Sequence, residues 1–345
     1  MRALGVLTGG GDCPGLNAAI RAIVRGGIAS GFELIGIRHG FRGLAEGETM
    51  PLDRHAVAGI LPRGGTILGS SSYDCFREDD GVRLVTQTAR ALDLDGVVAI
   101  GGEGTLAIAH RLHAEHAFPV VGVPKTIDND IGGTDVTIGF DTAVHICTEA
   151  IDRLHTTAES HNRVMIVEVM GRNTGWIAAA AGIAGGADVI LVPEVPATIE
   201  SVAEQVRKRH ARGRDFSIVV VAEGYRLTRD SGEQDAPVVR EIDEYGSERL
   251  GGVGRSVADE LEKLTGFDTR VTVLGHVQRG GTPTARDRLL ATRLGLRAAE
   301  LAAAREWGRM AAVRGNEIVD VPLSDVIEAR RDVPRAWIEA GRVVA

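Results

Sequence analysis

The stretch RALGVLTGGGDCPGLNAAIRAIVRGGIA, residues 2–29, contains the pattern that decides the fold. An apolar run from Leu4 to Leu7 is followed by the glycine-rich loop Gly9 to Asn17 and then by an amphipathic segment that extends to Ala29. A short apolar run, a glycine turn and a helical pattern in succession are typical of a β-strand that leads through a tight loop into a helix. Because glycine lets the backbone approach another group closely, the loop is a candidate ligand site.

The same alternation continues along the chain. Short apolar runs rich in valine and isoleucine predict further buried parallel strands at Glu33 to Ile37, Val97 to Ile100, Pro119 to Val123, Val164 to Val169, Ile218 to Val221 and Val271 to Leu274. Amphipathic segments that predict helices lie between these runs, at Thr105 to Ala114, Asp141 to Thr157, Ser201 to Arg212, Gly254 to Thr265 and Ala285 to Ala304. The alternation predicts an α/β fold of two interleaved, doubly wound (Rossmann-like) lobes with mostly parallel sheets.

The length of the chain supports two lobes. Its 345 residues exceed the roughly 250–300 at which a single hydrophobic core stops growing. We expect one lobe to comprise residues 1–139 and 279–329, and the other to comprise residues 140–278 and 330–345. Ligands are then expected beyond the carboxyl ends of the strands, where the polar and glycine-rich loops are concentrated.

Composition and charge exclude several classes of protein. The net charge of -8 argues against nucleic-acid binding, which needs a basic face. The three cysteines, Cys13, Cys75 and Cys147, have no paired spacing and predict neither a disulfide framework nor a zinc site. The N-terminus leads directly into the first strand without a signal-peptide pattern, and no apolar run approaches about 18 residues. We therefore expect a cytoplasmic protein with no nucleic-acid and no membrane partner.

Two glycine loops each end a predicted strand and begin a helix. The second, Gly101 to Thr105, follows the strand at Val97 to Ile100. Free backbone N–H groups and the helix dipole attract phosphate in this setting, so two such loops point to a polyphosphate. For either loop alone, a turn that only packs a helix on a strand is the alternative. Glu103 places a carboxylate beside the expected phosphates, as a Mg²⁺ site requires.

A third loop, PKTIDND at residues 124–130, contains two carboxylates, Asp128 and Asp130, directly after a predicted strand. Two carboxylates this close repel each other unless a cation or a ligand proton joins them. An aspartate with a pKa near ~4 accepts a hydroxyl proton only late in a reaction, which suits phosphoryl transfer. Capping of the next turn by Asp128 and Asn129 is the structural alternative. The loop therefore favours a phosphoryl-transfer enzyme, with Asp128 as the candidate catalytic base.

Four arginines flank or follow predicted strands, and guanidinium groups bind phosphate with two parallel hydrogen bonds. They are Arg163, Arg172, Arg270 and Arg279. A surface salt bridge is the alternative for each one alone. Arg21 and Arg25, four residues apart on the first helix, share one face, which is either solvated or binds the phosphate of an effector.

Taken in order, these loops resemble the phosphofructokinase family, and most closely its actinobacterial-type bacterial members. The resemblance covers nearly the whole chain and rests on the motifs GGGDCPGLN at 9–17, GGEGTL at 101–106, PKTIDND at 124–130, VMGR at 169–172 and GHVQRGG at 275–281. It implies an ATP-dependent 6-phosphofructokinase, which transfers a phosphoryl group to the 1-hydroxyl of fructose 6-phosphate with Mg²⁺ as the cofactor. It also implies a homotetramer, in which Arg163 and Arg270 reach the sugar phosphate across a subunit interface.

The resemblance assigns roles to particular residues, with the first lobe binding the nucleotide and the second the sugar phosphate. The implied catalytic residues are Asp128, Asp130, Thr126, Arg172 and Lys125. The implied nucleotide-binding residues are Gly10, Gly11, Ser72, Tyr73, Gly102, Glu103, Gly104 and Thr105, with Glu103 near the metal. The implied sugar-phosphate residues are Thr126, Ile127, Asp128, Arg163, Met170, Gly171, Arg172, Glu223, Arg270, His276, Val277, Gln278 and Arg279.

Three positions depart from the family pattern. Glu103 stands where aspartate is common, and its extra methylene moves the carboxylate by ~1.5 Å, which favours a water-mediated contact with Mg²⁺. Gly104 is typical of ATP users, because an aspartate there would repel an ATP α-phosphate, whereas Lys125 is typical of diphosphate users. Ser72 replaces an arginine that faces the transferred phosphoryl group. Our hypothesis is that Lys125, or else Arg77, supplies the missing positive charge.

Three alternatives to the ATP-dependent kinase are kept. A diphosphate-dependent phosphofructokinase is the first. A nicotinamide oxidoreductase is disfavoured because no G-x-G-x-x-G fingerprint follows the first strand. A catalytically silent nucleotide or sugar-phosphate sensor is disfavoured because the acidic pair Asp128 and Asp130 is present.

Overall fold

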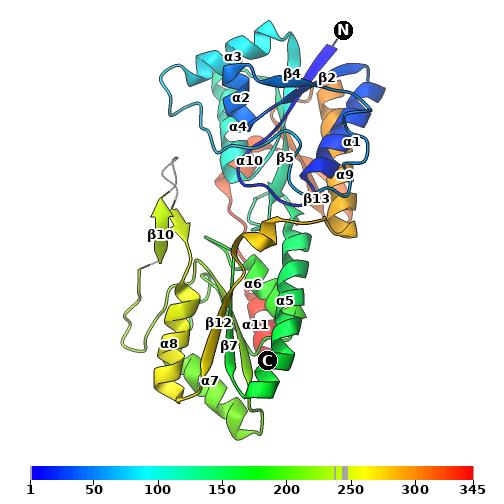
Figure 1. The fold of residues 1–345 in the computed structure, drawn as a ribbon. Helices are drawn as coiled ribbons and strands as arrows, with labels where there is room; N and C mark the ends of the chain where they lie inside the picture. Colours follow the sequence, from blue (N-terminus) through cyan, green and yellow to red (C-terminus); the bar gives the residue numbers. More distant parts are fainter. Residues whose placement is uncertain (1, 237, 243–247, 345) are drawn as a thin grey trace. The chain divides into compact units, whose positions relative to one another are not determined.

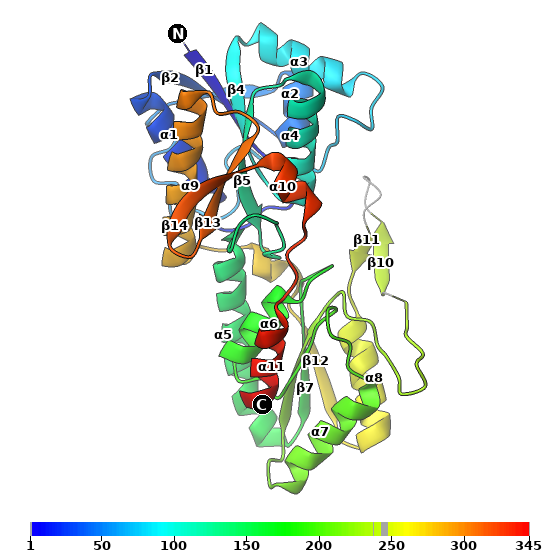
Figure 2. The same ribbon diagram turned by 180° about the vertical axis from the view of Figure 1, so that it is seen from behind.

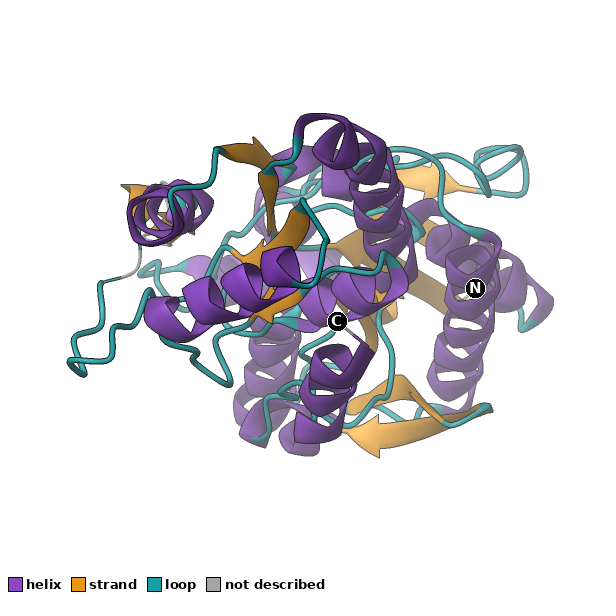
Figure 3. Ribbon diagram, turned by 90° about the horizontal axis from the view of Figure 1, so that it is seen from below, coloured by secondary structure: helices purple, strands orange, loops and turns teal. Residues whose placement is uncertain are grey.

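The computed structural model describes residues 2–236, 238–242 and 248–344 and divides the chain into two compact units. Unit 1 comprises Met1–Thr142 and Arg279–Arg331, and unit 2 comprises Ala143–Gln278 and Asp332–Ala345. Each unit is thus assembled from two separate stretches of the chain. In both units parallel strands are flanked by helices (Figures 1, 2 and 3).

The sheet of unit 1 has eight strands in the described part of the chain, in the order β14-β13-β5-β4-β1-β2-β3, with β6 paired to β5. The β2–β3 and β13–β14 pairs at its two edges are antiparallel, and the other pairs are parallel. The strands are β1 Arg2–Thr8, β2 Phe32–Ile37, β3 Thr49–Leu52, β4 Leu94–Gly101, β5 Val120–Thr126, β6 Ile138–Gly139, β13 Arg309–Arg314 and β14 Glu317–Pro322.

Helices cover both faces of this sheet (Figures 1 and 2). One face carries α1 Leu16–Ala29 and α9 Ala285–Ala304, and the other carries α2 Gly40–Glu46, α3 Gly81–Ala91, α4 Glu103–His116 and α10 Leu323–Glu328. The central strands β1 and β4 are buried along most of their length, as expected of strands covered on both faces. A large part of the core lies beneath the second face and includes Leu7, Ile37, Phe41, Leu44, Val85, Leu106, Leu112 and Met310.

Unit 2 contains a four-stranded sheet in which all pairs are parallel, in the order β12-β7-β9-β8. Its strands are β7 Val164–Val169, β8 Val189–Leu191, β9 Ser217–Ala222 and β12 Thr269–Val273, and β10 Val239–Ile242 pairs with β11 Glu248–Leu250 as a separate hairpin. The flanking helices are α5 Phe140–His161, α6 Trp176–Ala184 and α11 Arg335–Val344 on one face, and α7 Ile199–Ala211 and α8 Val253–Thr265 on the other. A short 3₁₀ helix, η1, spans Gly275–Arg279.

The predicted α/β class with mostly parallel sheets is confirmed, since the parallel pairs form both sheet centres and helices lie on both faces of each. None of the described helices is both long and apolar enough to cross a lipid bilayer.

Candidate active site

The first glycine loop joins β1 to α1, and side chains from three other segments bind its carbonyl oxygens. The ammonium of Lys125, at the end of β5, donates to the carbonyls of Gly9 (3.0 Å) and Gly11. The hydroxyl of Ser70 donates to the carbonyl of Gly10 (2.5 Å). Arg279 donates to the carbonyl of Asp12 (3.3 Å). Four consecutive carbonyls of the loop are therefore held from outside it.

The first four N–H groups of the same loop fall into two pairs. Those of Gly9 and Gly10 donate to the carbonyls of Ile100 (3.0 Å) and Ser71 (2.9 Å). Those of Gly11 and Asp12 have no acceptor among the residues that the structure describes, and both residues are exposed. Exposed N–H groups next to the beginning of a helix form a site for an anion such as phosphate.

Lys125 lies beneath this loop with only 2% of its surface exposed. Burial lowers the pKa of its ammonium, because the charged form loses water. The neighbouring thiol of Cys13 is fully buried, and burial raises its pKa to about 12, so Cys13 is unreactive. Ser72, the position that departs from the family's arginine, is exposed, and Arg77 is paired with Asp74 (3.5 Å).

The second glycine loop joins β4 to α4 and packs closely against the first. A Cβ atom at Gly101 would lie 2.3 Å from Cβ of Thr105, and one at Gly9 would lie 2.5 Å from its hydroxyl oxygen. Thr105 is 7% exposed and therefore fills the space between the two loops. A Cβ at Gly104 would meet nothing within 4 Å, and Gly104 is exposed. Of the predicted nucleotide residues, Tyr73 packs against the hydrophobic core of unit 1.

The acidic loop after β5 is held by Asn129, Thr126 and main-chain groups. Asn129 is 2% exposed and adopts the left-handed conformation (φ 53°), and its side-chain oxygen accepts from the N–H of Thr137 (3.0 Å). The hydroxyl of Thr126 accepts from the N–H of Asp128 (3.1 Å). The carbonyl of Asp130 accepts from the N–H of Arg331 (2.9 Å). The loop is thus fixed mainly through Asn129, Thr126 and main-chain groups.

The carboxyl of Asp130 is strongly perturbed. Burial, together with the negative charges of Asp128 and Glu103, raises its pKa to about 7. A bound divalent cation would relieve this repulsion. Within the described residues no group of three or more histidine, cysteine or acidic side chains could hold a metal ion by itself. Mg²⁺ does not need such a group, because it keeps several waters and takes phosphate oxygens as ligands beside one or two carboxylates.

The predicted sugar-phosphate residues of unit 2 follow three neighbouring strands. Met170, Gly171 and Arg172 follow β7, Glu223 follows β9, and η1 with His276 follows β12. These strands are adjacent and parallel, so the loops lie together at the carboxyl edge of the sheet.

Close backbone contacts connect these loops. The N–H of Gly224 donates to the carbonyl of Gly171 (3.1 Å), and a Cβ at Gly224 would lie 1.9 Å from the carbonyl oxygen of Arg172. Gln278 is fully buried; its side-chain oxygen accepts from the N–H of Met170 (3.1 Å), and its amide donates to the carbonyl of Gly275 (3.0 Å). Gln278 therefore supports the loops from within.

Several predicted ligand residues differ in exposure. Ile127 is fully buried in unit 1, so only its main chain is available to a ligand. Val277 is 60% exposed, and His276 is exposed beside it.

Arg163 and Arg270 lie at the other edge of the sheet. Arg163 precedes β7 and Arg270 is the second residue of β12, so both stand at the amino ends of the strands. The six residues of β7 separate this edge from Met170 by roughly 20 Å. Both guanidinium groups bind the carboxylate of Asp268, with Arg163 at 2.5 Å. Within one chain, therefore, these arginines do not join the loops at the carboxyl edge.

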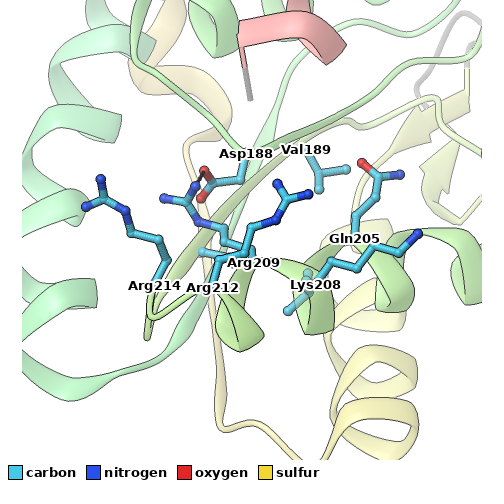
Figure 4. Close-up of a pocket in the computed structure, with 9 residues that line it drawn as sticks. Asp188, Val189, Gln205, Lys208, Arg209, Arg212 and Arg214 are labelled. Carbon is cyan, nitrogen blue, oxygen red and sulfur yellow. Dashed lines mark ion pairs between the residues drawn. The ribbon is translucent and has the colours of Figure 1, made fainter.

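The same amino edge contains a basic pocket of about 400 Å³ that sequence reasoning missed (Figure 4). The carboxylate of Asp188 accepts from the N–H of Ile218 (2.8 Å) and pairs with Arg209 (2.8 Å). The pocket is also lined by Lys208, Arg212 and Arg214, which give it a net positive charge. The signal in the sequence was the run RKRHARGR at 207–214, at the end of a predicted helix.

These features place the protein among the doubly wound α/β proteins whose ligands bind beyond the carboxyl ends of the strands. A family model described as phosphofructokinase matches residues 3–302. The chain belongs to the phosphofructokinase family.

Two relatives from Streptomyces coelicolor have names that specify different phosphoryl donors. One, named pyrophosphate–fructose 6-phosphate 1-phosphotransferase, is 54% identical over 97% of this chain and 97% of its own length. The other, named ATP-dependent 6-phosphofructokinase 3, is 51% identical over 96% of this chain and 97% of its own length. The solved phosphofructokinase of Saccharomyces cerevisiae is similar with a TM-score of 0.80 and 34% identity, over 95% of this chain. This chain spans 45% of the length of that yeast chain.

Proposed function

We propose that the protein is an ATP-dependent 6-phosphofructokinase, which transfers the terminal phosphoryl group of ATP to the 1-hydroxyl of fructose 6-phosphate. Family membership supports the reaction on the sugar phosphate. Overall identity does not select the donor, because the two Streptomyces relatives differ by only three percentage points, 54% against 51%. The choice of ATP therefore rests on individual residues.

Gly104 is the observation that carries the choice of ATP. An aspartate at this position would place a carboxylate in the exposed space beside the glycine loops, where it would repel the α-phosphate of ATP. Lys125 is typical of diphosphate users, but it is weaker evidence about the donor than Gly104 is. Its ammonium binds the carbonyls of Gly9 and Gly11. A diphosphate-dependent enzyme is the second candidate, and the name of the 54% identical relative favours it.

The proposed reaction assigns a role to each group at the loops. The sugar 1-hydroxyl oxygen forms a bond to the terminal phosphorus of ATP, the bond from that phosphorus to the bridging oxygen breaks, and ADP leaves. Asp128 accepts the hydroxyl proton late in the transfer. The exposed N–H groups of Gly11 and Asp12 and the beginning of α4 bind donor phosphates. Glu103 and Asp130 would hold Mg²⁺ near these phosphates, where the cation would supply positive charge.

We also propose that the active form is a homo-oligomer, with a tetramer expected from the family resemblance. The position of Arg163 and Arg270 supports this, since they lie at the amino edge of the sheet and the other sugar-phosphate residues lie at its carboxyl edge. In an oligomer they are available to the sugar phosphate of a neighbouring subunit. The cytoplasmic location remains a prediction of the sequence.

The donor is tested by assaying the purified protein with fructose 6-phosphate and Mg²⁺, and with either ATP or diphosphate. We expect turnover with ATP, and we expect Gly104→Asp to lower kcat/KM for ATP by about 100-fold, because a charge is added next to the α-phosphate. The substituted side chain has room, so the thermal stability of the variant is expected to match the wild type. Turnover by the wild type with diphosphate alone would reject the choice of ATP.

A further inference from the structure

The hydrogen bonds of Lys125 assign it a role that the sequence does not suggest. Its ammonium binds the carbonyl oxygens of Gly9 and Gly11 from below the loop and is 2% exposed. A buried ammonium that binds two carbonyls does not point toward solvent. A donor phosphate reaches the loop from the solvent side. Lys125 and the phosphate-binding N–H groups are instead connected through the loop backbone.

Peptide geometry makes this connection directional. A trans peptide unit is planar, and its C=O and N–H bonds point in opposite directions. The carbonyl of Gly11 and the N–H of Asp12 belong to one unit, so a carbonyl held by Lys125 directs that N–H to the opposite side. The carbonyl of Gly10 and the N–H of Gly11 belong to the preceding unit, whose carbonyl is held by Ser70. Lys125 and Ser70 together fix the orientation of both exposed N–H groups.

We propose that Lys125 is a positioning residue that holds the first glycine loop in its phosphate-binding conformation before the donor arrives. This inference rests on the proposed function, because it assumes that the loop binds the donor. It replaces the hypothesis that Lys125 contacts the transferred phosphoryl group in place of the arginine missing at Ser72. Both ATP and diphosphate bring phosphates to the same N–H groups, so the role of Lys125 is the same for either donor.

The test compares Lys125→Met with Lys263→Met, which removes an exposed lysine from α8 as a matched control. Hydrogen exchange is measured on the protein without any ligand. The N–H groups of Gly9 and Gly10 are hydrogen-bonded and serve as reporters of loop order. We expect their exchange to be at least about tenfold faster in Lys125→Met and unchanged in Lys263→Met. A lysine that acted only on the bound phosphoryl group would leave exchange in the free protein unchanged.

Kinetics supply the second measurement. We expect Lys125→Met to raise KM for the donor by about tenfold, while KM for fructose 6-phosphate changes less than about twofold. If Lys125→Met does not fold, Ser70→Ala is expected to show the same pattern to a smaller extent, because it releases only the carbonyls of Thr8 and Gly10.

Each result bears on the proposal. Unchanged exchange in the free variant together with slower turnover would overturn it and indicate direct contact with the donor. An equal rise in both KM values would also overturn it. If the wild type turns over neither ATP nor diphosphate, the proposed function fails, whereas the exchange experiment still shows whether Lys125 orders the loop.

Discussion

Polar side chains of the candidate site differ between the two units in their burial and in the hydrogen-bond partners that the chain provides for them. In unit 1, Lys125, Asn129 and Asp287 are at most 2% exposed, and each is bonded to the backbone of a neighbouring segment. In unit 2, the side chains of Arg163 and Arg270 are 31% and 50% exposed and share the surface carboxylate Asp268. The glycine and acidic loops of unit 1 are therefore ordered by contacts within one chain, whereas these two arginines of unit 2 are paired only at the surface.

The largest effect is expected at Asp128, where the proposed chemistry takes place in the ordered unit. Replacing its carboxylate in Asp128→Asn removes the proton acceptor and is expected to lower kcat by about 10²–10⁴-fold. Binding of fructose 6-phosphate, measured by calorimetry, should change little because the amide has nearly the same shape. A turnover close to that of the wild type would exclude Asp128 as the base.

The second prediction tests whether the exposed arginines act on another subunit. Arg163→Ala is expected to raise KM for fructose 6-phosphate by about 10–100-fold, through the loss of a charged hydrogen bond to phosphate. Arg335→Ala, which removes another exposed arginine, is the control and should leave KM unchanged.

Mixed oligomers make this test decisive. If each site combines Asp128 of one subunit with Arg163 of another, then reassembling Asp128→Asn with Arg163→Ala produces some sites that contain neither defect. We expect the mixture to recover activity that neither variant has alone. If the activity of the mixture is only the average of the activities of the two variants, at saturating and at low substrate, Arg163 acts within its own chain.

The third prediction compares how much a buried and an exposed carboxylate contribute to the free energy of unfolding. Asp287 accepts from the N–H of Gly139 (3.0 Å) and from the N–H and hydroxyl of Thr142 (2.8 and 2.6 Å). In Asp287→Asn one oxygen is replaced by a donor, so buried N–H and O–H groups lose their acceptor at a cost of about 1–3 kcal/mol. Urea unfolding is expected to show this loss, and a much smaller one for Asp268→Asn. Similar losses at both positions would remove the contrast between the units.

The sequence predicted the strands β1, β2, β4, β5, β7, β9 and β12 and the loops that follow them, because these signals are local, but it missed the buried interior strand β13. Strands buried on both faces are continuous apolar runs, and β7 was predicted with both of its ends correct. The strands β3 and β14 were missed because they lie at sheet edges, where half-exposed residues interrupt the apolar pattern. The short strand β8, with three residues, gave too little signal.

The candidate site was predicted as a set of motifs, without the contacts that connect them. The bond from Lys125 to Gly9 joins residues 116 apart in sequence, and that from Gly139 to Asp287 joins residues 148 apart. The arginine missing at Ser72 led to the hypothesis that Lys125 supplies its positive charge, whereas the burial of Lys125 beneath the loop depends on the order of β5, β4 and β1 in the sheet. Patterns of single residues contain no information of this kind.

The smallest effect is expected at Asp130, and it depends on pH. Its pKa in the folded protein is raised to about 7 from its ordinary value of 3.8, mainly by burial, so ionisation without a bound metal opposes folding. Below about pH 4 the group is protonated in both states and has no effect, and the destabilisation grows as the pH rises toward 7. Asp130→Asn is therefore expected to be more stable than the wild type above pH 7, by about 1 kcal/mol because the side chain retains some contact with water.

Thermal unfolding of both proteins from pH 4 to pH 8, in the presence of a chelator, measures this difference. Adding Mg²⁺ with the donor should reduce it, since the cation compensates the charge of Asp130, which the variant lacks. A difference that is constant over the pH range would show that Asp130 does not titrate there. The acidic loop of unit 1 would then owe its stability to Asn129 and the backbone alone, and its carboxylates would not be coupled.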